Sequence, residues 1–228
     1  MTPSHTIGIS VALVAAVAVA GCSSAGGTMR ASSQPVAGSP SELAAIAKAR
    51  ADSARYPYTA ADVHFMSGMI GHHAQAIVMA GWAPTHGASG SVRILSERII
   101  NAQQDEIATM QRWLADRRQS VPEARATGMK MMMNGAEHEM LMPGMLTEAQ
   151  MKQLDLARGA EFDRLFLTFM IQHHRGAVSM VKELFGSYGA GQDETVFKFA
   201  SDVNVDQSTE IDRMEKMLTS LPAEKGSP

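Results

Sequence analysis

Two pairs of adjacent histidines are the residues of this sequence best suited to bind a metal ion. The pairs are His72 with His73 and His173 with His174, each preceded by a methionine, Met69 or Met170. Imidazole nitrogens and thioether sulfurs favour copper, especially Cu(I), over iron or magnesium. The single cysteine, Cys22, excludes an internal disulfide, a thiolate zinc site and a cysteine-ligated blue-copper site. Any metal must therefore be held by His, Met, Asp or Glu.

The histidine pairs belong to an internal duplication. Residues 62–80 and 163–181 share eight of nineteen positions without a gap, and a Gln-x-x-Glu-Ile-x-x-Met pattern follows each segment. Self-similarity at this length predicts one helical hairpin used twice. At about 1.5 Å per residue, Gln103 and Glu106 fall level with His73. Gln207 and Glu210 fall level with His174 in the second copy.

Two-fold packing of the hairpins would gather the four histidines, Glu106 and Glu210 at the centre, flanked by Met69 and Met170. All eight are predicted as metal ligands. Adjacent helical residues diverge by about 100°, so we expect one ligand and one supporting or second-site histidine in each pair. Asp62 and Asp163, with Gln103 and Gln207, are expected to support the ligands. The alternative is a set of core histidines that bond to Glu and Gln, with methionine as packing.

The elements that must position these residues are helices. Apolar residues recur with a 3.6-residue period, and no segment after residue 41 sustains strand-like alternation. Helices are expected over residues 41–55, 59–82, 92–117, 160–185 and 194–218, with a shorter one capped by Thr147 and Gln150. We predict a single all-α domain over residues 42–221, folded as a four-helix bundle with pseudo-two-fold symmetry. Its repeats span about 59–117 and 160–220.

A methionine-rich connection, residues 118–146, separates the repeats and is expected to be loop-like. The chain has 18 methionines against 13 leucines, and eight methionines fall within residues 129–151. Thioethers suit Cu(I) outside the cytoplasm, where free thiols would oxidise. The candidate ligands of this segment are Met131, Met132, Met133, His138, Met140 and Met142. The alternative is an apolar strap over the bundle. His64 and His86 occur singly and are expected to be surface or hydrogen-bonded residues.

The first 41 residues are typical of an export signal followed by a flexible tether. An apolar run over residues 7–20 ends at Val-Ala-Gly-Cys, which resembles a bacterial lipoprotein signal cleaved before Cys22. That resemblance implies a lipid on Cys22, palmitate included, and export to the outer face of the cell membrane. In residues 23–41, eleven of nineteen are Ser, Gly or Pro, which predicts a flexible tether over residues 22–41.

The doubled Met-Ile-x-His-His-x-x-Ala motif, the Gln-x-x-Glu-Ile-x-x-Met helices and residues 143–177 together resemble a bacterial family, domain of unknown function 305. The resemblance covers about residues 62–218. It implies a ferritin-like bundle that is usually exported, with some members similar to copper-binding proteins of the cell envelope.

Three functions compete on this sequence. A lipid-anchored protein that sequesters copper or confers copper tolerance is favoured, because no activated nucleophile, phosphate loop or dinucleotide fingerprint is present. The second is a ferritin-like dinuclear iron or manganese enzyme that oxidises metal or handles peroxide, although neither histidine pair lies in a Glu-x-x-His motif. The third is a metal-free module that binds an envelope protein. The net charge of -3 argues against a nucleic-acid partner.

Overall fold

The computed structural model describes residues 39–44, 58–126, 128–133 and 136–222, and within residues 130–139 it describes the backbone alone. The signal, Cys22 and most of the expected tether lie outside these ranges, as does most of the helix expected over residues 41–55. Among the described helices, none is both long enough and apolar enough to cross a membrane.

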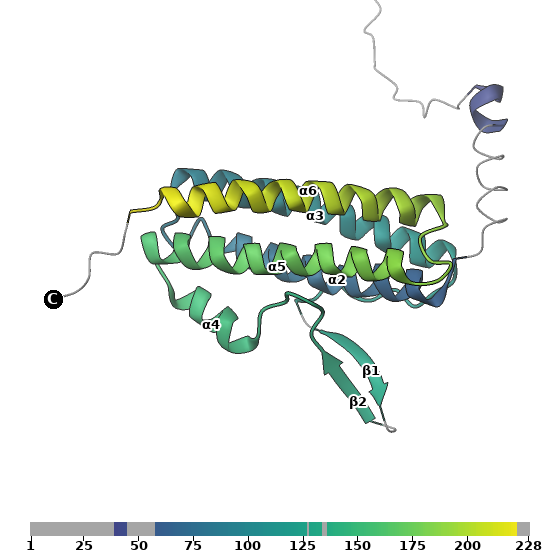
Figure 1. Ribbon diagram of the computed structural model, residues 1–228, viewed down its shortest axis with the longest axis horizontal. Helices are drawn as coiled ribbons and strands as arrows, with labels where there is room; N and C mark the ends of the chain where they lie inside the picture. The colour runs from purple at the N-terminus through teal and green to yellow at the C-terminus, as the bar shows by residue number, and fades with distance from the viewer. Residues whose placement is uncertain (1–38, 45–57, 127, 134–135, 223–228) are drawn as a thin grey trace, which may run out of the picture.

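Four long helices form the bundle: α2 (Ala60–Gly81), α3 (Gly90–Asp116), α5 (Ala160–Gly186) and α6 (Glu194–Ser220). Each repeat supplies one hairpin, because α2 packs against α3 and α5 against α6, while α2 and α5 join the two hairpins. Figure 1 shows α2 and α5 in one layer and α3 and α6 in the other. The duplicated four-helix bundle predicted from the repeat is confirmed.

Short polar side chains cap the starts of α2 and of the shorter helix α4. Thr59 and Asp62 form a reciprocal capping box at α2, and Thr147 and Gln150 form another at α4 (Glu148–Leu156). Such boxes satisfy backbone N–H groups that have no partner within the helix. The expected boundaries therefore agree with the observed ones to within about two residues.

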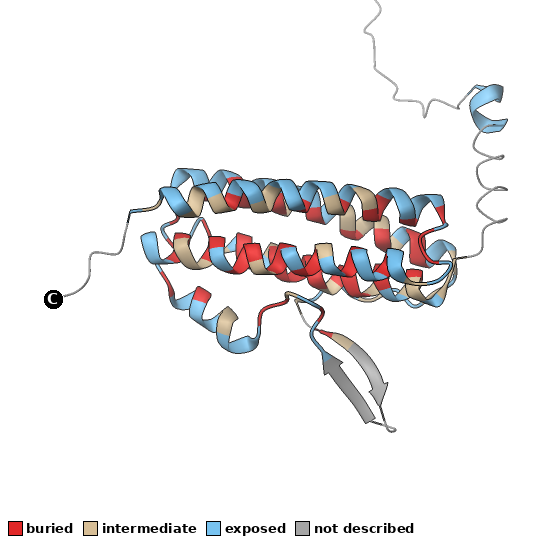
Figure 2. Ribbon diagram, in the orientation of Figure 1, coloured by how far each residue is buried: buried red, intermediate tan, exposed pale blue. Residues whose placement is uncertain are grey.

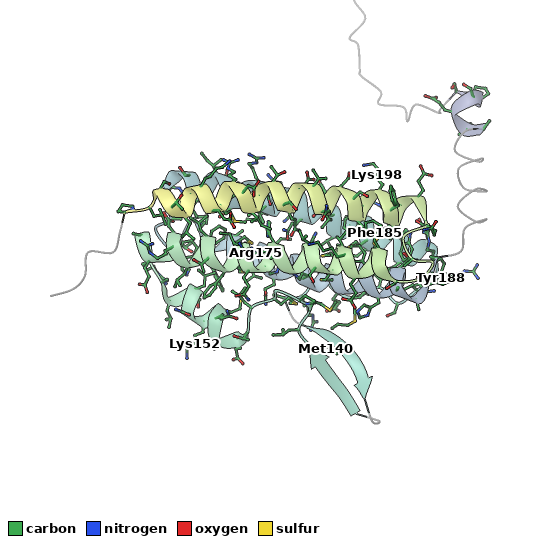
Figure 3. All side chains as sticks on the ribbon, in the orientation of Figure 1. Met140, Lys152, Arg175, Phe185, Tyr188 and Lys198 are labelled. Carbon is green, nitrogen blue, oxygen red and sulfur yellow. The ribbon has the colours of Figure 1, made fainter. Side chains whose placement is uncertain are left out.

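The core is divided along the bundle axis. One apolar cluster includes Phe65, Met69 and Trp113, and a second includes Leu95, Phe166 and Met170. Buried polar residues of all four helices occupy the sequence levels between the clusters: His72, His73, Gln103, His173, His174 and Gln207. Buried positions follow the inner helix faces in Figure 2, whereas Lys152 and Lys198 extend outward in Figure 3.

Asp62 and Asp163 join each hairpin to the loop of the other. Asp62 Oδ1 accepts the backbone N–H of Gly191 at 2.7 Å, and the Asp163 carboxylate accepts that of Ser89 at 3.1 and 3.2 Å. The expectation that these aspartates support the ligands is therefore wrong. Both share the inward stripe of the histidines, but they lie near the starts of α2 and α5 and hold the bundle ends.

The connection between the repeats is more ordered than expected. Residues 118–146 include strands β1 (Met129–Met133) and β2 (Ala136–Met140), which pair antiparallel with Met131 opposite His138. The expectation of a connection without strands is wrong. The hairpin and α4 lie on the α2–α5 side of the bundle, away from α3 and α6 (Figure 1).

A strap of residues 142–146 crosses that side. The Gln75 side chain donates to Leu146 O at 3.0 Å and accepts from Leu146 N at 2.7 Å. A Cβ added at Gly176 would lie 1.9 Å from Pro143 O, so only glycine allows the strap to reach α5. The strap therefore touches both central helices.

Gly176→Ala should displace the strap and lower the free energy of unfolding by about 1–3 kcal/mol, the usual cost of overpacking a tight contact. Chemical denaturation of the metal-free protein measures this loss. Gly81→Ala is the matched control, because an added Cβ meets nothing within 4 Å there. Equal stability of the two variants would contradict the close approach of strap and helix.

Candidate metal centre

The four histidines form a row across the bundle. The ring centroids of His72 and His73 are 6.2 Å apart with planes at 54°, and those of His173 and His174 have the same separation and angle. Between the pairs, the centroids of His72 and His173 are 3.8 Å apart. The equal geometry of the two pairs agrees with the predicted two-fold symmetry.

A glutamate ends the row on each side. His73 Nε2 lies 2.7 Å from Glu106 Oε2, and His174 Nε2 lies 2.8 Å from Glu210 Oε2. In the neutral tautomer that donates from Nε2, each ring keeps its lone pair on Nδ1. Neither Nδ1 has a hydrogen-bond partner among the described residues. The predicted metal ligands Glu106 and Glu210 thus lie against the outer rings, in the position from which a carboxylate orients a metal-binding imidazole.

The inner two histidines face the strap and each other. His72 Nε2 lies 3.0 Å from Pro143 O and donates a hydrogen bond to it in the tautomer protonated at Nε2, while His72 Nδ1 and both nitrogens of His173 lack a partner in the described structure. Burial lowers the pKa of His72 to about 3, and nearby His73 adds to the effect. The same cause, burial first and His72 next, holds the pKa of His173 well below its ordinary value. Both rings are therefore neutral near pH 7, the form that binds metal.

Met69 and Met170 lie one helical turn before His73 and His174, and both are fully buried. They belong to opposite apolar clusters, so one thioether lies on each side of the histidine layer. Each is placed to pack against the layer or to donate sulfur to an ion within it.

The layer is not a closed coordination sphere. Among the described residues, no three His, Cys, Asp or Glu side chains converge as a group that could hold a metal ion. The row supplies nitrogen donors in pairs, so binding one ion through more than two of them requires side-chain rotation. Two imidazoles, with or without a thioether, are enough for the low coordination numbers that suit Cu(I).

A pocket of about 250 Å³ opens between α3 and α6 beside this layer. Glu106 and Glu210 line it, with the two expected supporting amides, Gln103 and Gln207, and with Asp206. Burial raises the pKa of Asp206, and Glu106, Asp202 and Glu210 raise it further. Sequence reasoning missed Asp206, although its place next to Gln207 was a usable signal.

Of the methionine candidates in the connection, the structure describes the side chains of Met140 and Met142. Met142 is buried against Gly68, and Met140 is exposed at the end of β2. The side chains of Met131, Met132, Met133 and His138 lie outside the described structure. His86 is buried and bonded to Asp155 O at 2.8 Å, as expected for a structural histidine, and His64 is exposed.

Acidification should destabilise the metal-free protein. The folded-state pKa of His72 and of His173 lies below the unfolded value of about 6.5, so unfolding takes up protons. Stability is then full above about pH 6.5 and falls toward pH 3, by at most about 1.4 kcal/mol per pH unit for each histidine. Urea denaturation at pH 7, 6 and 5 measures this slope, and His173→Leu should reduce it. A wild-type stability that does not change over this range would contradict the buried neutral rings.

Residues 62–218 match the family described as Domain of unknown function (DUF305). A candidate secreted DUF305 protein from Streptomyces coelicolor is 26% identical with a TM-score of 0.60, covering 74% of this chain and 98% of its own. A DUF305 fragment from Deinococcus radiodurans is 29% identical with a TM-score of 0.60, covering 72% of this chain and 99% of its own. CopM in its Cu(I)-bound form is 25% identical with a TM-score of 0.54, covering 73% of this chain and 100% of its own. A comparison with curated proteins found no match. The chain belongs to the DUF305 family.

Proposed function

We propose that this protein is exported and binds copper at the central row of imidazoles, to sequester the ion or pass it on. The observation that carries this proposal is the set of four buried histidines whose Nδ1 atoms have no partner in the described structure. A buried polar atom without a hydrogen bond costs about 1–3 kcal/mol, and a bound ion would remove that cost.

The donor set fits copper best. Neutral imidazoles with thioethers on either side form a soft to borderline site, which suits Cu(I) and also accepts Cu(II) through nitrogen. CopM, which shares the fold, has been solved with Cu(I), with Cu(II) and with silver. In this chain we assign His72, His73, His173 and His174 as donors, Met69 and Met170 as sulfur donors, and Glu106 and Glu210 as the groups that hold the outer rings.

Export and anchoring complete the proposal. A lipid on Cys22 followed by the Ser/Gly/Pro tether would hold the bundle at the outer face of the cell membrane. The resemblance to a candidate secreted protein supports export. Thioether ligands keep their chemistry in such an oxidising compartment, where cysteine thiols do not.

One shared centre predicts non-additive losses. His73→Ala and His174→Ala should each weaken Cu(I) binding more than about tenfold, and the double variant should lose little more, because residues of one network do not act independently. Competition against a Cu(I) chelator under anaerobic conditions measures the affinities. His64→Ala, an exposed histidine on the same helix, is the matched control. Two independent sites would instead leave half the copper in each single variant.

Metal analysis of protein purified from its own envelope separates this proposal from its rivals. Two iron or manganese ions that react with oxygen would identify a dinuclear enzyme instead. Functional protein without metal would identify an interaction module.

The methionine-rich hairpin is proposed as a second, weaker Cu(I) site. Thioethers need no proton release, so Cu(I) should remain on this segment at pH 5, where histidine sites weaken. Replacing Met131, Met132, Met133, Met140 and Met142 by Leu keeps the volume and removes the sulfur. Titration at pH 5 should then show fewer bound Cu(I) ions. An unchanged number of bound Cu(I) ions would show that these methionines only pack against the bundle.

A further inference from the structure

The two sides of the buried histidine row differ in what covers them. All four histidines are fully buried, and the strap covers them on the α2–α5 side through the contact of Pro143 O with His72. On the α3–α6 side, by contrast, the side chains of Glu106 and Glu210 are 21% exposed and line the 250 Å³ pocket. An ion that approaches from this pocket meets the carboxylates before the rings.

Oxygen donors surround that pocket. Besides the two glutamates, Gln103 and Gln207 are 97% buried and line it, yet Gln103 Oε1 and both polar atoms of the Gln207 amide have no partner among the described residues. Buried amide atoms are normally hydrogen-bonded, so these indicate a ligand that the protein chain does not supply. Amide and carboxylate oxygens are suited to a hydrated cation.

Asp206 adds a third carboxylate that the duplication does not explain. At the 104-residue offset that relates Gln103 to Gln207, the counterpart of Asp206 is Ala102, which lines the same pocket. The nearby cation Lys198 is paired with Asp202, whereas Asp206 makes no hydrogen bond or ion pair within the described residues. Arg98 at the rim is the one basic residue of the lining. The pocket lining therefore carries three carboxylates and one basic side chain, so its net charge is negative.

We propose that the α3–α6 pocket is the port through which a partly hydrated metal cation enters the centre, with Asp206 as its docking carboxylate. This inference rests on the proposed copper function. The cation exchanges water for the oxygens of Asp206 and the amides, and then passes the glutamates to the unpartnered ring nitrogens. The amides and glutamates come from both repeats, while Asp206 comes from the second alone.

The test is the rate of Cu(II) uptake by the metal-free full chain. Aqueous Cu(II) is mixed rapidly with protein, and a colorimetric chelator traps the remaining ion at fixed times. Asp206→Asn should slow uptake about tenfold at low salt, the lower end of electrostatic focusing, and leave the final stoichiometry unchanged. Asp202→Asn changes net charge equally one turn away and should keep the wild-type rate.

A rescue variant distinguishes docking from a structural role. Ala102→Asp places a carboxylate at the symmetry-related position, so the double variant with Asp206→Asn should regain most of the rate. Equal rates for wild type, Asp206→Asn and Asp202→Asn would overturn the port while leaving copper binding intact. Loss of final stoichiometry in Asp206→Asn would make Asp206 a permanent ligand and also overturn it. Absence of copper uptake by the wild type would overturn both proposals.

Discussion

A layer of histidine and amide side chains crosses the middle of an apolar bundle, and its polar atoms must be satisfied there or left at a cost of about 1–3 kcal/mol each. Glu210 is hydrogen-bonded to His174 Nε2, Glu106 Oε2 lies 2.7 Å from His73 Nε2, and Pro143 O accepts from one nitrogen of His72. Several nitrogens remain without a partner among the described residues. Packing alone would favour leucine at these positions. The layer is therefore understandable as a site whose ligand completes it.

Contacts elsewhere in the fold fix the positions of the helices that carry this layer. Apolar clusters on both sides fix the helix levels, and the aspartates at the bundle ends tie each hairpin to the loop of its partner. Gln75 binds both backbone polar atoms of Leu146, which fixes the strap over the inner histidines. Rigid supports of this kind keep ligand rotamers in place, which reduces the ordering cost when an ion binds.

Sequence reasoning was strongest where the information was local or repeated. Caps such as Thr59 with Asp62 gave the helix starts, and the duplicated register placed Glu106 beside His73 and Glu210 beside His174. It failed where contacts join distant segments. Nothing local shows that Gly176 admits Pro143, or that Asp62 bonds to Gly191. Sequence reasoning does not predict the hairpin because neither β1, which is mostly methionine, nor β2, with three consecutive polar residues, alternates between polar and apolar residues, although Asn134-Gly135 is a turn signal in the sequence.

The duplication accounts for the paired side chains of the layer, whereas the strap and Asp206 have no counterpart in the other repeat. Two equal hairpins produce equal halves, as the matching ring geometry shows. The two-fold axis does not relate its own two ends, because one end lies between α2 and α5 and the other between α3 and α6 (Figure 1). The single strap closes the α2–α5 end of that axis, because only one connection joins the two repeats. The α3–α6 end stays open and carries the carboxylate of Asp206, which the first repeat lacks. The strap on one side and the carboxylate-lined pocket on the other therefore give the two approaches to the histidine layer different chemistry.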